Sequence, residues 1–498
     1  MEHPSGVRDW SPAAVASERA KLAEFERRWK ALPTDGWPVG QMVDYRLLGS
    51  ALARVRWELD VNPRWQRDPA FYIEQTIDPL QEELMPPPPF SAARSREIVA
   101  RVENIPSILE QAKLNLKAVA PFAQLTIAML SDIDVRLARV ERGVSPLLAS
   151  DDQRARFQTA IAAASKALID YRIWLTQRLS SMRQDFVLGG NAYGFFLHRV
   201  ALLPYTPDQL LTMARQDFER VLAMESYEHQ RDLHAPELKM AATAGEETAR
   251  MARDDAQIRR YLTDHQILTV PADLPHWTLR PAPDYVAAFD GFGELDDFTG
   301  PSRLHENGTR WIHPPSNDLG YFWKAYAQDP RTTGVHEGVP GHFFQLSLAW
   351  RNRDPIRRQY YDSGANEGIG FYAEEMMLDT GLYDDSPRSR EIIYNFARLR
   401  ALRVEVDVKL ALGQFTIAQA ADYLARTVPM DRGTADGDPR RLPPLPASAS
   451  RMKSASCRSS GCWPIGVCSR AANSACARFT IMSRPTATCR YRCSAGNC

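Results

Sequence analysis

The chain has 498 residues, with 61 Lys and Arg against 61 Asp and Glu, and it is 44% hydrophobic and 24% charged. This is the composition of a globular protein, and it excludes a disordered, a collagen-like and a fully membrane-embedded chain. The balanced charge offers no basic surface, so we expect no nucleic-acid partner. The most apolar stretch, 114–130, is too short and polar to span a bilayer, so we expect no membrane partner. The first 20 residues lack an apolar segment of the signal-peptide kind, and we expect a cytoplasmic protein.

Most of the chain is predicted to be helical. Residues 1–205 are expected to form an N-terminal helical region, which is broken at Pro86–Pro89 because successive prolines exclude a helix. Thr206 is predicted to cap a helix that has proline at its first position, and Thr416 is predicted to open another through a capping box. The stretch 284–330 is rich in Gly, Pro, Asp and Asn, and we predict irregular structure there.

The segment that follows carries the residues of a metal site. His336 and Glu337, followed by His342, resemble the zinc hydrolase helix, in which two histidines bind metal and the glutamate is the general base. Here the second histidine comes at i+6, about 240° around an ideal helix from the first, so a regular helix would not chelate. Pro340 has no N–H and Gly341 tolerates unusual backbone angles. We therefore predict a bulge or break that returns His342 to the side of His336.

A zinc site with a free position for water needs a third protein ligand. Glu367 lies 25 residues after His342 and is a candidate for that ligand. Glu374 follows two helical turns later on the same face, where it is suited to orienting a ligand from behind. Glu375 and Asp379 form the rival acidic pair.

Substrate contacts and oxyanion stabilisation require further polar groups near the metal. Arg400, Arg403 and Asp407 share one helix face, and such arginines could hold a peptide carboxylate. The interpretation we favour for them is structural, with ion pairs to Asp407 or Glu405. The remaining candidates for a donor near the metal are His313, Tyr321 and Tyr372.

The motif H-E-G-V-P-G-H-x-x-Q, followed by E-G-x-x-x-Y-A-E, resembles the bacterial "domain of unknown function 885" family, which is similar to helical zinc metallopeptidases. The resemblance is close over 188–434 and loose in the N-terminal third. It implies a mainly α, helical zincin-like metallopeptidase fold with little sheet. It also implies His336, His342 and Glu367 as ligands of one Zn2+ per chain, with Glu337 as base. Gln345, Tyr372, Glu374, Arg400, Arg403 and Tyr321 are expected to support the metal ligands or to contact the substrate.

The predicted function is a zinc-dependent hydrolase, specifically a metallopeptidase acting on a peptide or small amide. Residues 206–435 would form its metal-binding catalytic region, where Glu337 takes the proton of a metal-activated water. One alternative is a catalytically inactive helical scaffold or binding protein. Another is a metal hydrolase of a non-peptide amide, which the sequence does not distinguish from a peptidase.

The segment 436–498 differs in composition from the rest of the chain. All seven cysteines lie at or beyond Cys457, and from Pro439 onward there are ten basic residues and no acidic ones. Back-translation in another frame, with permitted synonymous codons, removes every cysteine and yields an amphipathic run, IGKLQIIRLLADRRL, at helical spacing. We therefore predict a frameshift or sequencing error between about Thr434 and Leu442. Resequencing the gene checks this, and an uninterrupted frame encoding the same tail in related strains would contradict it.

Overall fold

The computed structural model describes residues 9–428, 430–431 and 433–435, and helices dominate this part of the chain. The predicted mainly α class with little sheet is confirmed. The predicted frameshifted tail, 436–498, lies outside the described residues. None of the described helices is long and apolar enough to cross a membrane.

The N-terminal elements are almost all helices. In chain order they are α1 Pro12–Lys30, α2 Val39–Arg56, η1 Trp57–Val61, α3 Arg64–Arg67, α4 Ala70–Leu84, α5 Ala92–Asn115, α6 Ala120–Met129, α7 Ile133–Val144, η2 Ser145–Leu147, α8 Asp151–Arg178, η3 Leu179–Ser181, α9 Gly190–Phe195 and η4 Phe196–Val200. The predicted break at Pro86–Pro89 is confirmed, because it falls between α4 and α5.

The second part of the chain adds a small sheet to further helices. Its elements are α10 Pro207–Arg231, α11 Ala244–Asp264, β1 Trp277–Pro281, α12 Asp284–Ala287, β2 Asp296–Asp297, β3 Gly308–Ile312, α13 Tyr321–Gln328, α14 Pro330–Thr333, η5 Gly334–Gly338, α15 His342–Trp350, α16 Pro355–Gln359, α17 Ser363–Asp379, α18 Pro387–Ala411 and α19 Ile417–Thr427. The stretch 284–330, predicted to be irregular, holds two of the three strands.

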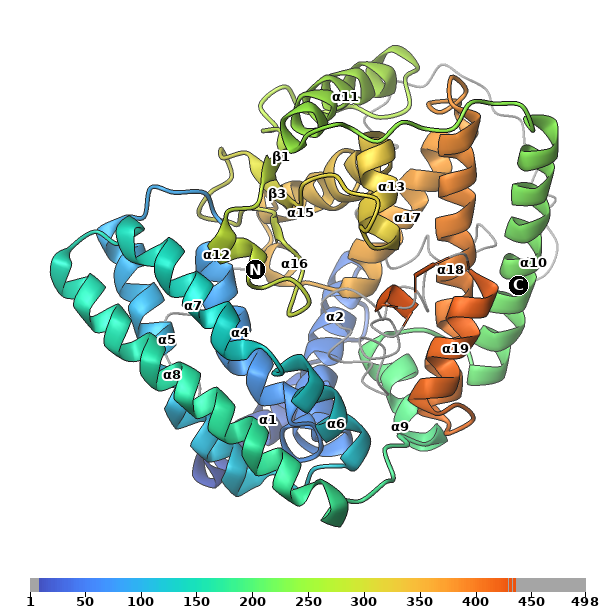
Figure 1. Cartoon of the computed structure of the whole chain (residues 1–498). Coiled ribbons are helices and arrows are strands. Elements are labelled where there is room, and N and C mark those ends of the chain that lie inside the picture. Colours follow the sequence, from blue (N-terminus) through green and yellow to red (C-terminus); the bar gives the residue numbers. More distant parts are fainter. Residues whose placement is uncertain (1–8, 429, 432, 436–498) are drawn as a thin grey trace.

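Helices α5 and α8 pack side by side because each buries one apolar stripe. The buried positions recur every three or four residues, which places them on one face of each helix. In α5 these are Ile98, Val102, Ile105, Leu109 and Ala112, and in α8 they are Phe157, Ile161, Ala164, Leu168, Tyr171 and Leu175. With α4 and α7 they form the helical layer on the left of Figure 1.

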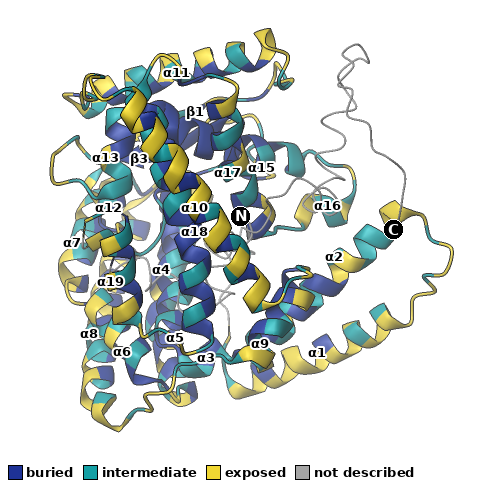
Figure 2. Cartoon of the chain, turned by 90° about the vertical axis from the view of Figure 1, so that its right-hand side faces the viewer, coloured by how far each residue is buried: buried dark blue, intermediate teal, exposed yellow. Residues whose placement is uncertain are grey.

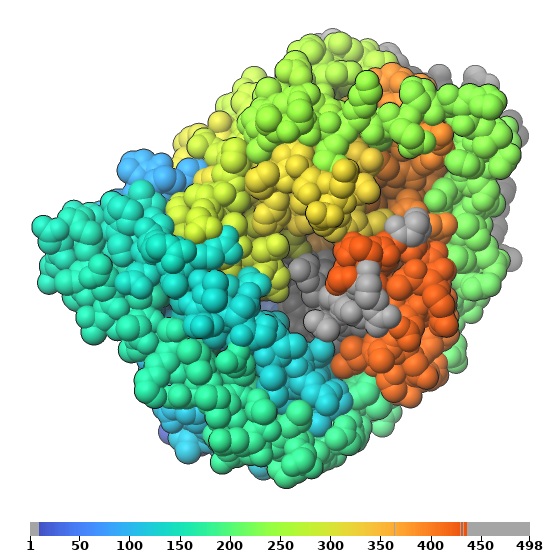
Figure 3. Space-filling model, viewed as in Figure 1, coloured from blue at the N-terminus to red at the C-terminus, as the bar shows by residue number. Residues whose placement is uncertain are grey.

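The sheet has the strand order β1-β3-β2, with β1 parallel and β2 antiparallel to the central strand β3. It lies beside α11, α13, α15 and α17, at the top of Figure 1. Helices α10 and α18 run next to each other on the opposite side from α8, and α18 is buried along much of its length (Figure 2). In the space-filling view of Figure 3 the helices α5 to α8 lie at the lower left, and α10 and α19 lie at the right.

The predicted boundary at 205/206 stays a prediction, although hydrophobic clusters extend across it. Tyr285 and Trp311 belong to the same buried cluster as the N-terminal helices, and Trp57 packs in a cluster with Leu210 and Val404. The two parts of the chain therefore share core packing.

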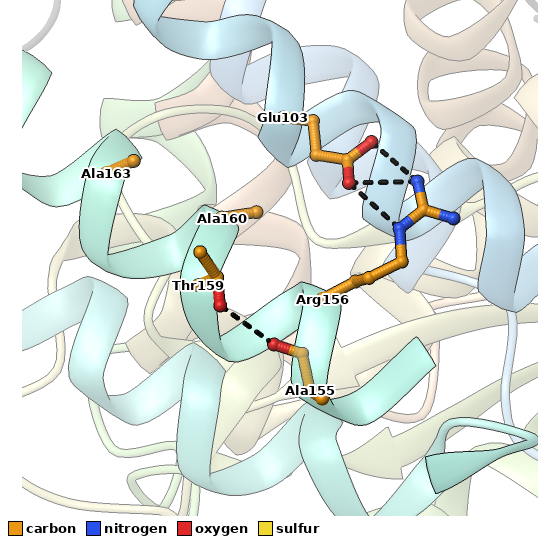
Figure 4. Close-up of a pocket in the computed structure, with 6 residues that line it drawn as sticks. All are labelled: Glu103, Ala155, Arg156, Thr159, Ala160 and Ala163. Atoms are coloured by element: carbon orange, nitrogen blue, oxygen red, sulfur yellow. Dashed lines mark hydrogen bonds and ion pairs between the residues drawn. The ribbon is translucent and has the colours of Figure 1, made fainter. Parts of the chain in front are cut away.

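A shallow hollow lies between α5 and α8, remote in sequence from the predicted metal ligands (Figure 4). In it the Arg156 guanidinium donates to both Glu103 carboxylate oxygens at 2.9 Å. Both side chains are exposed, and a surface ion pair of this kind contributes little stability. The remaining lining side chains are small, so the hollow offers no further ionic or metal-binding group.

Both predicted helix caps are confirmed. The Thr206 hydroxyl accepts from the Gln209 backbone N–H at 3.2 Å, and the Gln209 side chain accepts from the Thr206 N–H at 2.9 Å. Thr416 and Gln419 form the same reciprocal pair at the start of α19. Each cap satisfies backbone donors that the first helical turn leaves without partners.

We predict that Thr206→Ala lowers the free energy of unfolding by about 1 kcal/mol, because it removes the cap oxygen. Thr212→Ala is the matched control, since Thr212 is exposed within the same helix and alanine has the higher helix propensity. Urea unfolding, followed by circular dichroism, measures the free energy of unfolding of both variants. Equal effects of the two substitutions would contradict the assigned cap.

Candidate metal site

The backbone break predicted after His336 is present. The π-helical turn η5 ends at Gly338, Val339 is extended, and α15 begins at His342. The chain then passes very close to the turn it has left, since a Cβ at Gly341 would lie 1.8 Å from the His336 carbonyl oxygen. Only glycine permits this approach, which carries His342 back to the side of His336.

The two imidazoles meet a carboxylate from α17. Their ring centroids are 4.5 Å apart, and Glu367 Oε2 lies 3.9 Å from His336 Nε2 and 3.8 Å from His342 Nε2. All three side chains are buried. Ligand atoms around a tetrahedral zinc ion lie roughly 3.3–3.5 Å apart, so a small contraction would give a zinc site.

Glu337 lies beside these three groups. Its Oε2 is 3.8 Å from His342 Nε2, and its nearest ligand atoms lie within 4.8 Å of those of both histidines. Its Oε1 is 3.0 Å from Nη1 of Arg310, a residue of β3. Arg310 was not predicted from the sequence, because no motif marks it.

Glu374 contacts His336 at Nδ1, the ring nitrogen that does not face Glu367. Its Oε1 is 2.8 Å from His336 Nδ1 and accepts from Arg400 Nη2 at 2.7 Å. The Arg400 guanidinium also lies 4.0 Å from the Phe371 ring centroid. Histidine ligands commonly donate their second N–H to such a carboxylate, which fixes the tautomer and the ring orientation. Arg400 thus has a partner, Glu374, that the sequence analysis did not assign to it.

The other predicted site residues lie at different distances from this cluster. The Gln345 side-chain oxygen accepts from Asn366 Nδ2 at 2.9 Å, next to Glu367 in α17. The Tyr321 hydroxyl donates to Asn395, and Arg403 lies 5.5 Å from the Phe322 ring centroid. Tyr372 is 52% exposed, whereas the cluster is buried. The proposed substrate and oxyanion roles of these residues stay predictions.

His313 and Glu375, one member of the rival acidic pair, have partners away from the cluster. His313 Nε2 is 3.3 Å from Asp290, and its ring packs against Trp323. Glu375 accepts from Arg220 at 3.1 Å.

Burial controls the charge state of the cluster. It lowers the pKa of His336 and lowers that of His342 further, so both rings are neutral and able to bind metal at pH 7. Burial raises the pKa of Glu337 to about 8 and that of Glu367 well above its ordinary value. Burial also opposes ionisation of Glu374, but the Arg400 charge and the hydrogen bonds from His336 and Arg400 outweigh it and lower that pKa.

A cation fits this set of donors. Glu337 Oε2, Glu367 Oε1 and His342 Nε2 are buried and have no hydrogen-bond partner among the described residues. Buried polar atoms are normally paired, so each such atom needs an explanation. Two neutral imidazoles with two carboxylates are the ligand types that zinc prefers. A bound divalent cation would satisfy Glu337 Oε2 and His342 Nε2 and would favour the ionised form of both carboxylates.

The fold and site define a mainly α-helical protein with a buried His-Glu-His cluster joined by a second glutamate. The family described as "Bacterial protein of unknown function (DUF885)" matches residues 3–450, and the chain belongs to this family. No curated protein matches the chain.

Two solved structures are similar in fold. One, a "putative lipoprotein of unknown function" from Shewanella oneidensis, is 18% identical, covers 92% of this chain and 86% of its own, and gives a TM-score of 0.66. The other, a "putative lipoprotein" from Colwellia psychrerythraea, is 15% identical. It covers 92% of this chain and 84% of its own, and gives a TM-score of 0.69. At these identities the likeness concerns the fold alone.

We predict that Gly370→Ala weakens zinc binding at least about tenfold. A Cβ at Gly370 would lie 2.7 Å from His336 Cε1 and 2.8 Å from His342 Cε1, so both rings must move. Gly368→Ala is the matched control, since its Cβ would meet nothing within 4 Å in the same helix. Competition with a chromophoric chelator gives the zinc dissociation constant of each variant. Equal zinc affinity in the two variants would show that the rings do not bind the ion where they converge.

Proposed function

We propose that this chain is a zinc-dependent hydrolase of the metallopeptidase type, with a helical zincin-like fold. The observation that carries the proposal is the convergence of His336 Nε2, His342 Nε2 and Glu367 Oε2 in a buried cluster, with Glu337 beside it. A zinc ion held there would supply Lewis acidity and lower the pKa of a coordinated water toward about 7.

The role of Glu337 follows from its two oxygens. Oε1 is held by Arg310, and Oε2 is buried on the side of His342, without a hydrogen-bond partner in the part of the chain that the structure describes. Oε2 is therefore the atom that would accept a proton from water and pass it to the leaving amine.

The remaining residues would hold the ligands in place. Glu374 orients His336, and Arg400 keeps Glu374 ionised and fixed. Gln345, through Asn366, supports the turn of α17 that carries Glu367. We propose peptides or small amides as substrates, and the cytoplasmic location stays a prediction.

Metal content and cleavage test the proposal separately. We expect the purified chain to hold one zinc per molecule and His336→Ala to hold none, because the ion loses a ligand. Glu337→Gln is expected to keep zinc but to lose cleavage of a peptide mixture by at least about 100-fold, as loss of a general base does. Elemental analysis and mass spectrometry of the products measure the two effects.

The two results discriminate between functions. Failure to bind zinc would contradict the metal site itself. Zinc binding without cleavage of any peptide would favour an amide other than a peptide, or a scaffold that retains the ion.

A further inference from the structure

Arg310 is the buried cation closest to Glu337 in the described part of the chain. It lies at the centre of β3, where its backbone pairs with Asp296 of the edge strand β2. Its Nη1 is 2.9 Å from Asp296 Oδ2 and 3.0 Å from Glu337 Oε1. The Arg310 and Asp296 side chains are 4% and 1% exposed, so little water screens these contacts.

Two aromatic rings of α13 fix the guanidinium in space. It lies 4.9 Å from the Trp323 ring centroid and 5.1 Å from that of Tyr326. These distances are typical of cation–π contacts. Strand pairing, the Asp296 carboxylate and the two rings therefore hold Arg310 independently of Glu337.

The contact with Arg310 determines how Glu337 presents its carboxylate. A glutamate side chain has several rotamers, and leaving it free would spread its oxygens over several positions. Arg310 engages Oε1 and leaves Oε2 on the side of His342 Nε2, 3.8 Å away. The side chain is thus preorganised toward the metal ligands by a group that is itself immobile.

We propose that Arg310, held by Asp296, is a positioning residue that aims Glu337 Oε2 at the metal cluster. The inference rests on the proposed function, in which Glu337 is the base. Arg310 has no direct part in binding the metal ion, because its guanidinium contacts Glu337 Oε1 and not Oε2. The rival explanation is that Arg310 only neutralises buried carboxylates and so stabilises the fold.

A double-mutant cycle separates these roles. The probe is acetohydroxamate, which chelates zinc and donates hydrogen bonds to a carboxylate beside the metal. Its dissociation constant is measured on the zinc-loaded full chain for the parent, Arg310→Met, Glu337→Gln and the double variant. We expect Arg310→Met to weaken acetohydroxamate binding about tenfold in the parent and to have no further effect in the Glu337→Gln background. The zinc affinity of Arg310→Met is expected to differ from that of the parent by less than about twofold.

Control variants keep the test decisive. Arg280→Met removes an exposed arginine of the neighbouring strand β1 and should change neither the acetohydroxamate affinity nor the zinc affinity. If Arg310→Met does not fold, Asp296→Asn replaces it in the same cycle, because it retains side-chain size and releases Arg310 from one partner.

The outcomes are distinguishable. An equal loss of acetohydroxamate affinity in both Glu337 backgrounds, or no loss in the parent background, would overturn the positioning role and leave the zinc site intact. A parent chain that binds no zinc would overturn the proposed function, and the inference with it.

Discussion

The candidate site depends on the close passage of the chain at Gly341 over the carbonyl of His336. A side chain at Gly341 would put Cβ 1.8 Å from that oxygen, far inside any van der Waals contact. Gly370 permits an equivalent approach from α17, whose backbone there lies next to both imidazoles. Two glycines thus allow three backbone segments to come close enough for side chains of ordinary length to meet at one point. Without these approaches the i+6 spacing would separate the histidines.

Two arginines compensate the buried carboxylates around the cluster. Arg400 contacts Glu374, and Arg310 contacts both Glu337 and Asp296. Glu367 is different, because no arginine forms an ion pair with it in the part of the chain that the structure describes. Its Oε2 instead faces the two imidazoles. A buried carboxylate without a cation is costly, and a metal between Glu367 and the histidines would offset that cost.

Local features of this protein could be predicted from the sequence, as could the two α17 carboxylates that lie near the histidines, but the arginine partners of the carboxylates could not. The caps at Thr206 and Thr416 and the break at Pro86–Pro89 depend on neighbouring residues, and all were predicted. The metal motif was visible because its residues lie within seven positions of one another. Arg310 was missed because it reaches Glu337 only through the pairing of two short strands in a segment predicted to be irregular.

Buried atoms without a partner among the described residues favour a bound ion at the cluster on physical grounds. A buried polar atom without a partner costs about 1–3 kcal/mol, and apolar side chains of the same shape would avoid that cost. The cluster keeps such atoms on Glu337, Glu367 and His342, from three separate elements that converge on one place. A protein that served only as a scaffold would gain stability by replacing them. Their presence together favours a cation as the missing partner, and we propose hydrolysis as the use of that cation because Glu337 Oε2 lies beside His342.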